Sequence, residues 1–163
     1  MKNKKILFMT QAAMIATFYV VLTLIFQAIS FGQIQVRIAE ALTILPAFTP
    51  AAIPGLFIGC LISNIMGGAA LWDIVFGTLA TLIGAVFTYL LRKQKAFAIV
   101  LPPILSNTLI IPFVLRYAYG INLPIYFLAG SIAIGEVISC GMLGMILFSA
   151  LQKNKEKIFG YHN

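Results

Sequence analysis

Long hydrophobic runs that end at short basic clusters constrain this chain more than any other feature. The first run, Ile6 to Ile29, holds no charged residue. As a helix it would be about 36 Å long, enough to cross the roughly 30 Å hydrocarbon core of a bilayer with some tilt. A signal peptide has a shorter apolar core and a small-residue cleavage site, and Ser30-Phe31-Gly32 is a poor one. We therefore expect this run to be retained as a first membrane span.

Basic residues gather at the ends of the hydrophobic runs. Nine of the eleven lysines and arginines fall within Lys2–Lys5, Arg92–Lys95 and Lys153–Lys157. Cytoplasmic loops of membrane proteins carry such an excess, so the net charge of +7 does not indicate nucleic acid as a partner. Only 9% of the residues are charged, against about 25% in a soluble domain. We expect a multi-pass protein of the cell membrane whose residues 1–163 form a single domain in the lipid bilayer.

The number of spans between the first two basic clusters must be even if both clusters are cytoplasmic. Three prolines recur every four residues in the region that decides this number: Pro46, Pro50 and Pro54. A continuous helix does not easily accommodate them, because an internal proline removes a backbone hydrogen bond and clashes with the preceding turn. The region Ile34–Met66 is therefore predicted to form a hairpin of two short helices that meet near Thr49–Ala52.

Three further spans are expected after this hairpin, at Ile74–Leu91, Ala96–Tyr117 and Pro124–Leu151. The predicted fold is an all-α integral membrane protein with six transmembrane helices and both termini in the cytoplasm. Small residues recur at steps of four in the third span, which is typical of close helix contact: Gly55, Gly59, Ser63 and Gly67.

The few polar residues inside the spans are the candidates for function, because a charge at membrane depth costs about 3 kcal/mol or more. Glu136 and Asn107 lie in different helices, each about 18 Å from the outer end by helical rise. A carboxylate can accept two N–H bonds from the amidine-like edge of a guanine, and a carboxamide offers a donor and an acceptor. We predict that both residues bind a flat, nitrogen-rich ligand. Structural hydrogen bonds between helices are the alternative for both.

Arg37 and Glu40 are the closest pair of opposite charges between hydrophobic runs. Three residues apart on a helix, they would share a face and pair. Asp73 is predicted to cap the helix that follows it, and Asp73 or Glu40 would also suit a cationic aminomethyl group on a ligand. Trp72 is either an interfacial anchor or an aromatic lid over a ligand. The remaining candidate binding residues are Asn64 and Arg116.

The sequence gives little support for an enzyme. It contains no Walker motif, no Ser/His/Asp set and no Cys/His metal spacing, and its one histidine, His162, lies in a polar tail. We therefore expect no catalytic residues, no metal and no cofactor. Cys60 and Cys140 lie inside hydrophobic segments, where small buried thiols are ordinary core residues.

The stretch FGQIQVRIAEALTILP, Phe31 to Pro46, resembles the signature of the QueT-type queuosine-precursor transporters. The resembling residues are Phe31, Gly32, Ile34, Gln35, Arg37, Glu40, Ala41, Leu42 and Pro46. The resemblance implies the bundle of a substrate-binding (S) component of an energy-coupling factor transporter. Such a component would capture a queuosine precursor, a deazaguanine base, for ATP-driven import. Its implied partners are a transmembrane coupling subunit and two ATPase subunits of a separate energising module.

In the S-component family, an alanine pair in the first helix docks on the coupling subunit. The matching positions here are Ala12 and Ala16. Small residues four apart are equally common where helices pack within one bundle, so both interpretations of the pair stay open.

Three other functions remain as alternatives. A self-sufficient, ion-coupled secondary transporter of a small polar metabolite would use Glu136 as a proton relay, although no internal repeat of the usual kind is visible. An S component for another vitamin-like substrate would have the same architecture. A structural membrane protein without a ligand is disfavoured, because charged groups at membrane depth are expensive.

Overall fold

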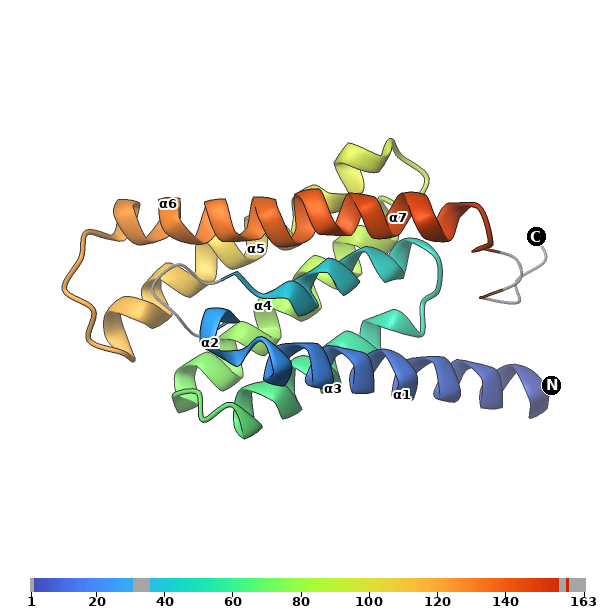
Figure 1. Cartoon of the computed structure of the whole chain (residues 1–163), viewed down its shortest axis with the longest axis horizontal. Coiled ribbons are helices and arrows are strands. Elements are labelled where there is room, and N and C mark those ends of the chain that lie inside the picture. Colours follow the sequence, from blue (N-terminus) through green and yellow to red (C-terminus); the bar gives the residue numbers. More distant parts are fainter. Residues whose placement is uncertain (1, 31–35, 156–157, 159–163) are drawn as a thin grey trace.

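The structure is a computed structural model that describes residues 2–30, 36–155 and 158 (Figure 1). These residues form helices and no strand, which confirms the all-α prediction. The elements are α1 (Lys2–Ile25), α2 (Gln27–Ser30), η1 (Ile38–Ala47), α3 (Ala52–Met66), α4 (Leu71–Leu90), α5 (Ala96–Tyr117), α6 (Ile125–Glu136), η2 (Val137–Leu143) and α7 (Gly144–Gln152). The last three follow one another directly as one long helix, in which η2 is a π-helical segment.

Within the described residues, four helices are long and apolar enough to cross a membrane: Lys4–Ile25, Leu71–Leu90, Ala96–Tyr117 and Ile125–Gln152. The other two apolar helices, η1 and α3, are shorter. At 1.5 Å per residue, α3 is only about 22 Å long, less than the roughly 30 Å hydrocarbon core. The chain breaks between them at residues 48–51, so the predicted pair of short helices with a break near Thr49–Ala52 is confirmed. Residues 34–35, where the predicted hairpin begins, lie outside the described residues.

The first helix of this hairpin, η1, is a 3-10 helix over its whole length, although such runs rarely exceed a few residues. The Thr43 hydroxyl donates to the Glu40 carbonyl oxygen at 2.6 Å and competes with backbone donors for it. Pro46 lies inside η1 and has no N–H to donate. Both features disfavour the regular bonding pattern of an α-helix in this segment.

η1 occupies the centre of the bundle. It contacts α1, α3, α4, α5, η2 and α7, and Figure 1 shows it between α1 and the long last helix. Its side chains must therefore be small, apolar or internally paired, and seven of them are buried: Ala39, Glu40, Ala41, Thr43, Ile44, Leu45 and Pro46. Glu40 is the acidic residue of this set, so the centre of the fold carries a carboxyl group.

The predicted small-residue stripe on α3 does make a close helix contact, and its partner is α1. A Cβ atom added to Gly55 would lie 2.8 Å from the Ala12 carbonyl oxygen. One added to Gly59 would lie 2.8 Å from the Tyr19 Cβ and 3.1 Å from the Ala16 Cα. Glycine is required at these crossing points because no Cβ fits between the two backbones.

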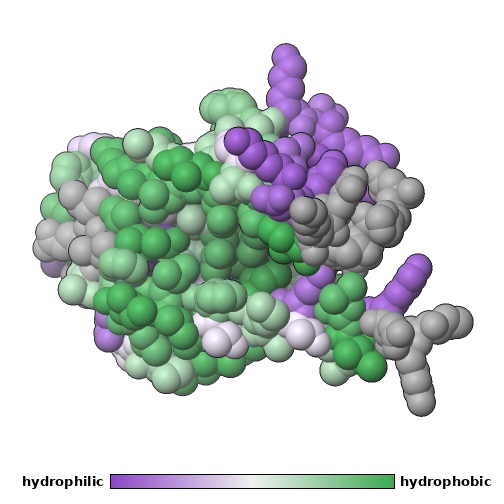
Figure 2. Space-filling view, turned by 45° about the vertical axis from the view of Figure 1, so that its right-hand side comes forward, coloured by the Kyte–Doolittle hydropathy of each residue, from purple (hydrophilic) through white to green (hydrophobic). Residues whose placement is uncertain are grey.

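The basic clusters lie at one end of the molecule. α1 begins at the end where α7 finishes, and the connection between α4 and α5 is at that end as well (Figure 1). Figure 2 shows hydrophilic groups gathered there, whereas most of the remaining visible face is hydrophobic. The exposed basic residues of these segments are Lys4, Lys5, Arg92, Lys93, Lys95, Lys153 and Lys155. This arrangement agrees with the charge pattern from which the spans were predicted.

Candidate functional site

Glu136 and Asn107 meet in the interior of the bundle. Glu136 is the last residue of α6, and Asn107 lies midway along α5. The Asn107 Nδ2 donates to Glu136 Oε1 at 2.9 Å, and the Cys140 thiol donates to Glu136 Oε2 at 3.1 Å. The equal depth predicted from helical rise is therefore confirmed, and the carboxylate is held by one donor on each oxygen.

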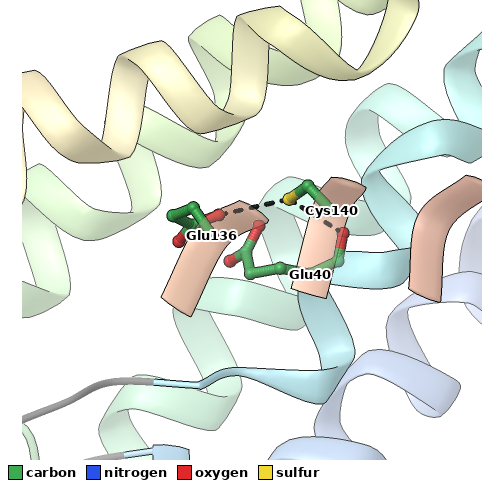
Figure 3. Close-up of side chains that lie close together, drawn as sticks. All are labelled: Glu40, Glu136 and Cys140. Carbon is green, nitrogen blue, oxygen red and sulfur yellow. Dashed lines mark hydrogen bonds between the residues drawn. The ribbon is translucent and has the colours of Figure 1, made fainter. Parts of the chain in front are cut away.

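Glu40 approaches the same place from η1. It is fully buried and accepts a hydrogen bond from the Tyr19 hydroxyl through Oε1, and within the described part of the chain its Oε2 has no hydrogen-bond partner. The Cys140 Sγ lies 3.5 Å from the Glu40 carbonyl oxygen and 3.4 Å from the Thr43 hydroxyl. Figure 3 shows the Glu40 and Glu136 carboxylates close to the Cys140 thiol, so η1 and the last helix bring together groups about a hundred residues apart.

A second polar group forms around Asp73. The Arg37 Nη2 lies 3.6 Å from Asp73 Oδ2, and the Tyr119 hydroxyl donates to the same oxygen at 2.9 Å. Tyr119 in turn accepts a hydrogen bond from the Ala70 N–H at 3.1 Å. Partial burial raises the pKa of Tyr119, which lies beyond the end of α5, so its phenol stays protonated and able to donate.

Two predictions about these residues are wrong. Arg37 precedes η1 with an extended backbone (φ −89°, ψ 97°), and its ion pair joins it to Asp73 instead of placing it beside Glu40 on a helix face. Asp73 lies inside α4, whose N-cap is Ala70, and makes no capping bond. The physical reason is the same for both: a buried charge is stabilised most by an opposite charge, and the fold supplies one from a distant segment.

The buried charges do not balance. Three of the four acidic residues of the chain are buried in this interior, namely Glu40, Asp73 and Glu136. One buried guanidinium, Arg37, lies among them and is 6% exposed. An apolar interior penalises uncompensated charge strongly, so this region favours a cation or shared protons over three free carboxylates.

Asn64 lies near Asp73, the centre of the second polar group. It is 1% exposed, and its Nδ2 is 3.5 Å from the Cys60 Sγ. A Cβ added to Gly77 would lie 3.4 Å from Asn64 Nδ2 and 3.0 Å from Asp73 Oδ1. Because Gly77 has no side chain, there is room beside it for the Asn64 amide and the Asp73 carboxylate.

Four predicted functional residues lie away from the buried polar groups. Trp72 is 58% exposed, stacks on Phe76, and lines a cavity of about 360 Å³ between α4 and α5. Arg116 donates to the Leu123 carbonyl oxygen at 2.8 Å in the connection after α5. Ala12 and Ala16 contact the glycines of α3. That contact favours packing within the bundle over docking, the alternative that we left open.

Sequence reasoning missed Tyr19, Thr43 and Cys140 as members of the cluster. Cys140 follows Glu136 by four residues, so the helical period was a usable signal for a shared face. Thr43 follows Glu40 by three residues and carried the same kind of signal. Tyr19 carried none, because a single hydroxyl in an apolar helix indicates nothing about its partner.

Substitution of Arg37 by Lys should weaken ligand binding less than tenfold and lower the melting temperature slightly. Lysine keeps the charge opposite Asp73 but loses the planar fork of donors. The measurement is thermal melting together with calorimetric titration of the purified variant. Arg37→Met is the matched comparison, since it removes the charge at similar length; equal damage from both changes would show that charge is not what matters at this position.

Comparison with known proteins gives a consistent result. A family model described as QueT transporter matches residues 9–153, from α1 to just beyond α7. The queuosine precursor transporter QueT of Lactococcus lactis subsp. cremoris (strain MG1363) is 37% identical over 86 residues, which is 51% of this chain and 50% of that protein. The chain thus matches about half the length of this curated relative. No solved structure matches the chain. Because the family model covers the chain from its first span to its last, the resemblance is confirmed, and this multi-pass membrane protein belongs to the QueT transporter family.

Proposed function

We propose that this protein is the substrate-binding component of an energy-coupling factor transporter and that it captures a queuosine precursor, a deazaguanine base. The observation that carries this proposal is the buried excess of carboxylates around Glu136 and Asn107, inside a bundle that is otherwise apolar. A transporter of a polar, nitrogen-rich base needs such acceptors at membrane depth. The name of the Lactococcus relative, a queuosine precursor transporter, indicates the same class of substrate.

The geometry suits recognition of the amidine-like edge of the base. Asn107 and Cys140 hold the Glu136 carboxylate in one orientation, with one donor to each oxygen. Each oxygen keeps a further lone pair, which the ligand can use for two parallel N–H bonds. A group that is already oriented loses less freedom when the ligand binds. A cationic aminomethyl substituent would be stabilised by the second carboxylate, Glu40.

The proposal includes six spans with both termini and the α4–α5 connection in the cytoplasm. It is supported by the basic residues that these segments share at one end of the molecule. The shorter η1 and α3 would enter the bilayer side by side with their turn shielded by protein, as irregular backbone at membrane depth requires.

A cysteine placed at Gln94 should resist an impermeant thiol reagent added to intact cells, in a chain whose Cys60 and Cys140 are replaced by serine. Gln94 is exposed in the α4–α5 connection among basic residues, which the positive-inside rule assigns to the cytoplasm. Permeabilised cells provide the control, in which the same cysteine should react. Ready labelling in intact cells would overturn the six-span topology.

The energising module is proposed to dock along α1. Only 28% of the α1 span is buried in the bundle, compared with 33% of the last span, 44% of the α4 span and 50% of the α5 span. The wide uncovered face leaves room for another membrane subunit. Ala12 and Ala16 remain the positions that the family resemblance suggests, although Ala16 is already buried against α3.

Uptake of the labelled aminomethyl deazaguanine base into liposomes tests the transport role. We expect uptake only when the protein is reconstituted with an energising module and ATP, since the sequence has no nucleotide-binding motif of its own. Liposomes with an inward proton or sodium gradient but no module are the control. Uptake driven by a gradient alone would contradict the proposal and support the secondary-transporter alternative.

A further inference from the structure

The Cys140 thiol orients the Glu136 carboxylate, and it also lies against η1, the helix that carries Glu40. Its Sγ donates to the Glu136 carboxylate oxygen Oε2 at 3.1 Å and lies 3.5 Å from the backbone carbonyl oxygen of Glu40. We propose that Glu40, Glu136 and Cys140 together form a binding site for a thiophilic divalent cation, of which Zn²⁺ is the representative.

The spacing of the three groups suits one ion. A carboxylate oxygen of Glu40, one of Glu136 and the Cys140 Sγ all lie within 4.8 Å of one another. In a tetrahedral site zinc lies about 2.0–2.3 Å from its oxygen and sulfur ligands, so those ligand atoms are roughly 3.3–3.8 Å apart. Small side-chain rotations therefore bring the three atoms to bonding distance. Figure 3 shows the three groups close together, from η1 and from the last helix.

The Oε2 atom of Glu40 also favours binding of a cation. Glu40 is fully buried, yet its Oε2 has no hydrogen-bond partner among the described residues, and a buried acceptor left unpaired is destabilising. The Arg37 guanidinium, the nearby cation, makes its ion pair with Asp73. A divalent ion would coordinate this oxygen and offset two of the three negative charges of Glu40, Glu136 and the Cys140 thiolate.

The donor set indicates which cation would bind. Magnesium and calcium prefer oxygen ligands throughout, whereas a thiolate favours zinc and similar soft ions. The thiol must lose its proton when the ion binds, so binding releases a proton and weakens as the pH falls. Sequence spacing did not reveal this set, because Glu40 lies far along the chain from the other two ligands.

The ion and the base would compete. Both need the Glu136 carboxylate, so saturation with Zn²⁺ should lower the affinity for the aminomethyl deazaguanine base, and the protein would bind one or the other. The inference does not depend on the proposed function, because the ion can be tested without any base present.

The experiment is a titration of the purified, tag-free, chelator-stripped protein with Zn²⁺ against a fluorescent zinc chelator, together with thermal melting. We expect one ion per chain, a raised melting temperature, and no comparable effect of Mg²⁺. Cys140→Ser should weaken Zn²⁺ binding by more than about tenfold, since even changes behind the ligands cost about 10- to 100-fold. Glu40→Gln is the second variant and should weaken it as well. Melting in chelator shows whether each variant is folded.

Two matched controls locate the ion. Cys60→Ser removes the other buried thiol, and His162→Ala removes the one histidine, so both variants should bind Zn²⁺ like the parent. Equal binding by Cys140→Ser and the parent, or no binding by the parent, would overturn the inference. Binding of the base is measured separately, in the presence of chelator. The zinc site can therefore be disproved without disproving the proposed base-binding function, and the reverse also holds.

Discussion

Substitution of Glu136 by Gln is expected to weaken binding of the aminomethyl deazaguanine base by on the order of a hundredfold. The proposed contact is a pair of charge-assisted hydrogen bonds, each stronger than a neutral one. Glutamine keeps the shape of the side chain but removes its charge and turns one acceptor into a donor. That donor would face an N–H of the base, and the combined cost of about 3 kcal/mol corresponds to roughly a hundredfold in affinity.

The fold should tolerate this change, which makes the measurement decisive. Asn107 can rotate its amide to accept from the new NH₂ group, because its side chain offers both a donor and an acceptor. Calorimetric titration with the base measures affinity, and thermal melting checks folding. Ser131→Ala on the same helix is the control, since Ser131 donates to its own helix at the Leu128 carbonyl. If Glu136→Gln folds and binds like the parent, Glu136 is a structural residue.

Substitution of Gly59 by Ala is expected to destabilise the protein by about 1–3 kcal/mol, the usual cost of overpacking a close contact. The added Cβ would lie 2.8 Å from the Tyr19 Cβ and 3.1 Å from the Ala16 Cα and carbonyl oxygen. Backbone atoms of α1 cannot rotate aside, so α1 and α3 must separate. Tyr19 would move with α1, and its hydroxyl holds the Glu40 carboxylate, so ligand affinity should fall together with stability.

Gly130→Ala is the matched control for this prediction. No atom lies within 4 Å of a Cβ added to Gly130, and alanine is favoured over glycine inside a helix by about 1 kcal/mol. Its melting temperature should therefore stay the same or rise. If Gly59→Ala melts like the parent in the same detergent, the α1–α3 contact is looser than the structure indicates.

Much of the fold could be predicted from local pattern. The uncharged runs give the long helices, because a bilayer-spanning segment needs about twenty apolar residues whatever its partners are. The prolines at 46, 50 and 54 place the break at residues 48–51, since their effect on the backbone is local. The depth of Glu136 and Asn107 followed from helical rise alone, and the structure joins the two side chains at 2.9 Å.

Pairing of the buried charges was decided only by the tertiary structure. Rules based on neighbours in sequence assigned Arg37 to Glu40 and made Asp73 a helix cap, whereas the fold joins Arg37 to Asp73 and encloses Glu40 with Tyr19. Short-range rules describe the small energies of exposed helix surfaces, but in a low-dielectric interior the partner at the shortest distance dominates. Which groups come within that distance depends on how η1 sits among six neighbouring elements, and no local pattern in the sequence specifies that placement.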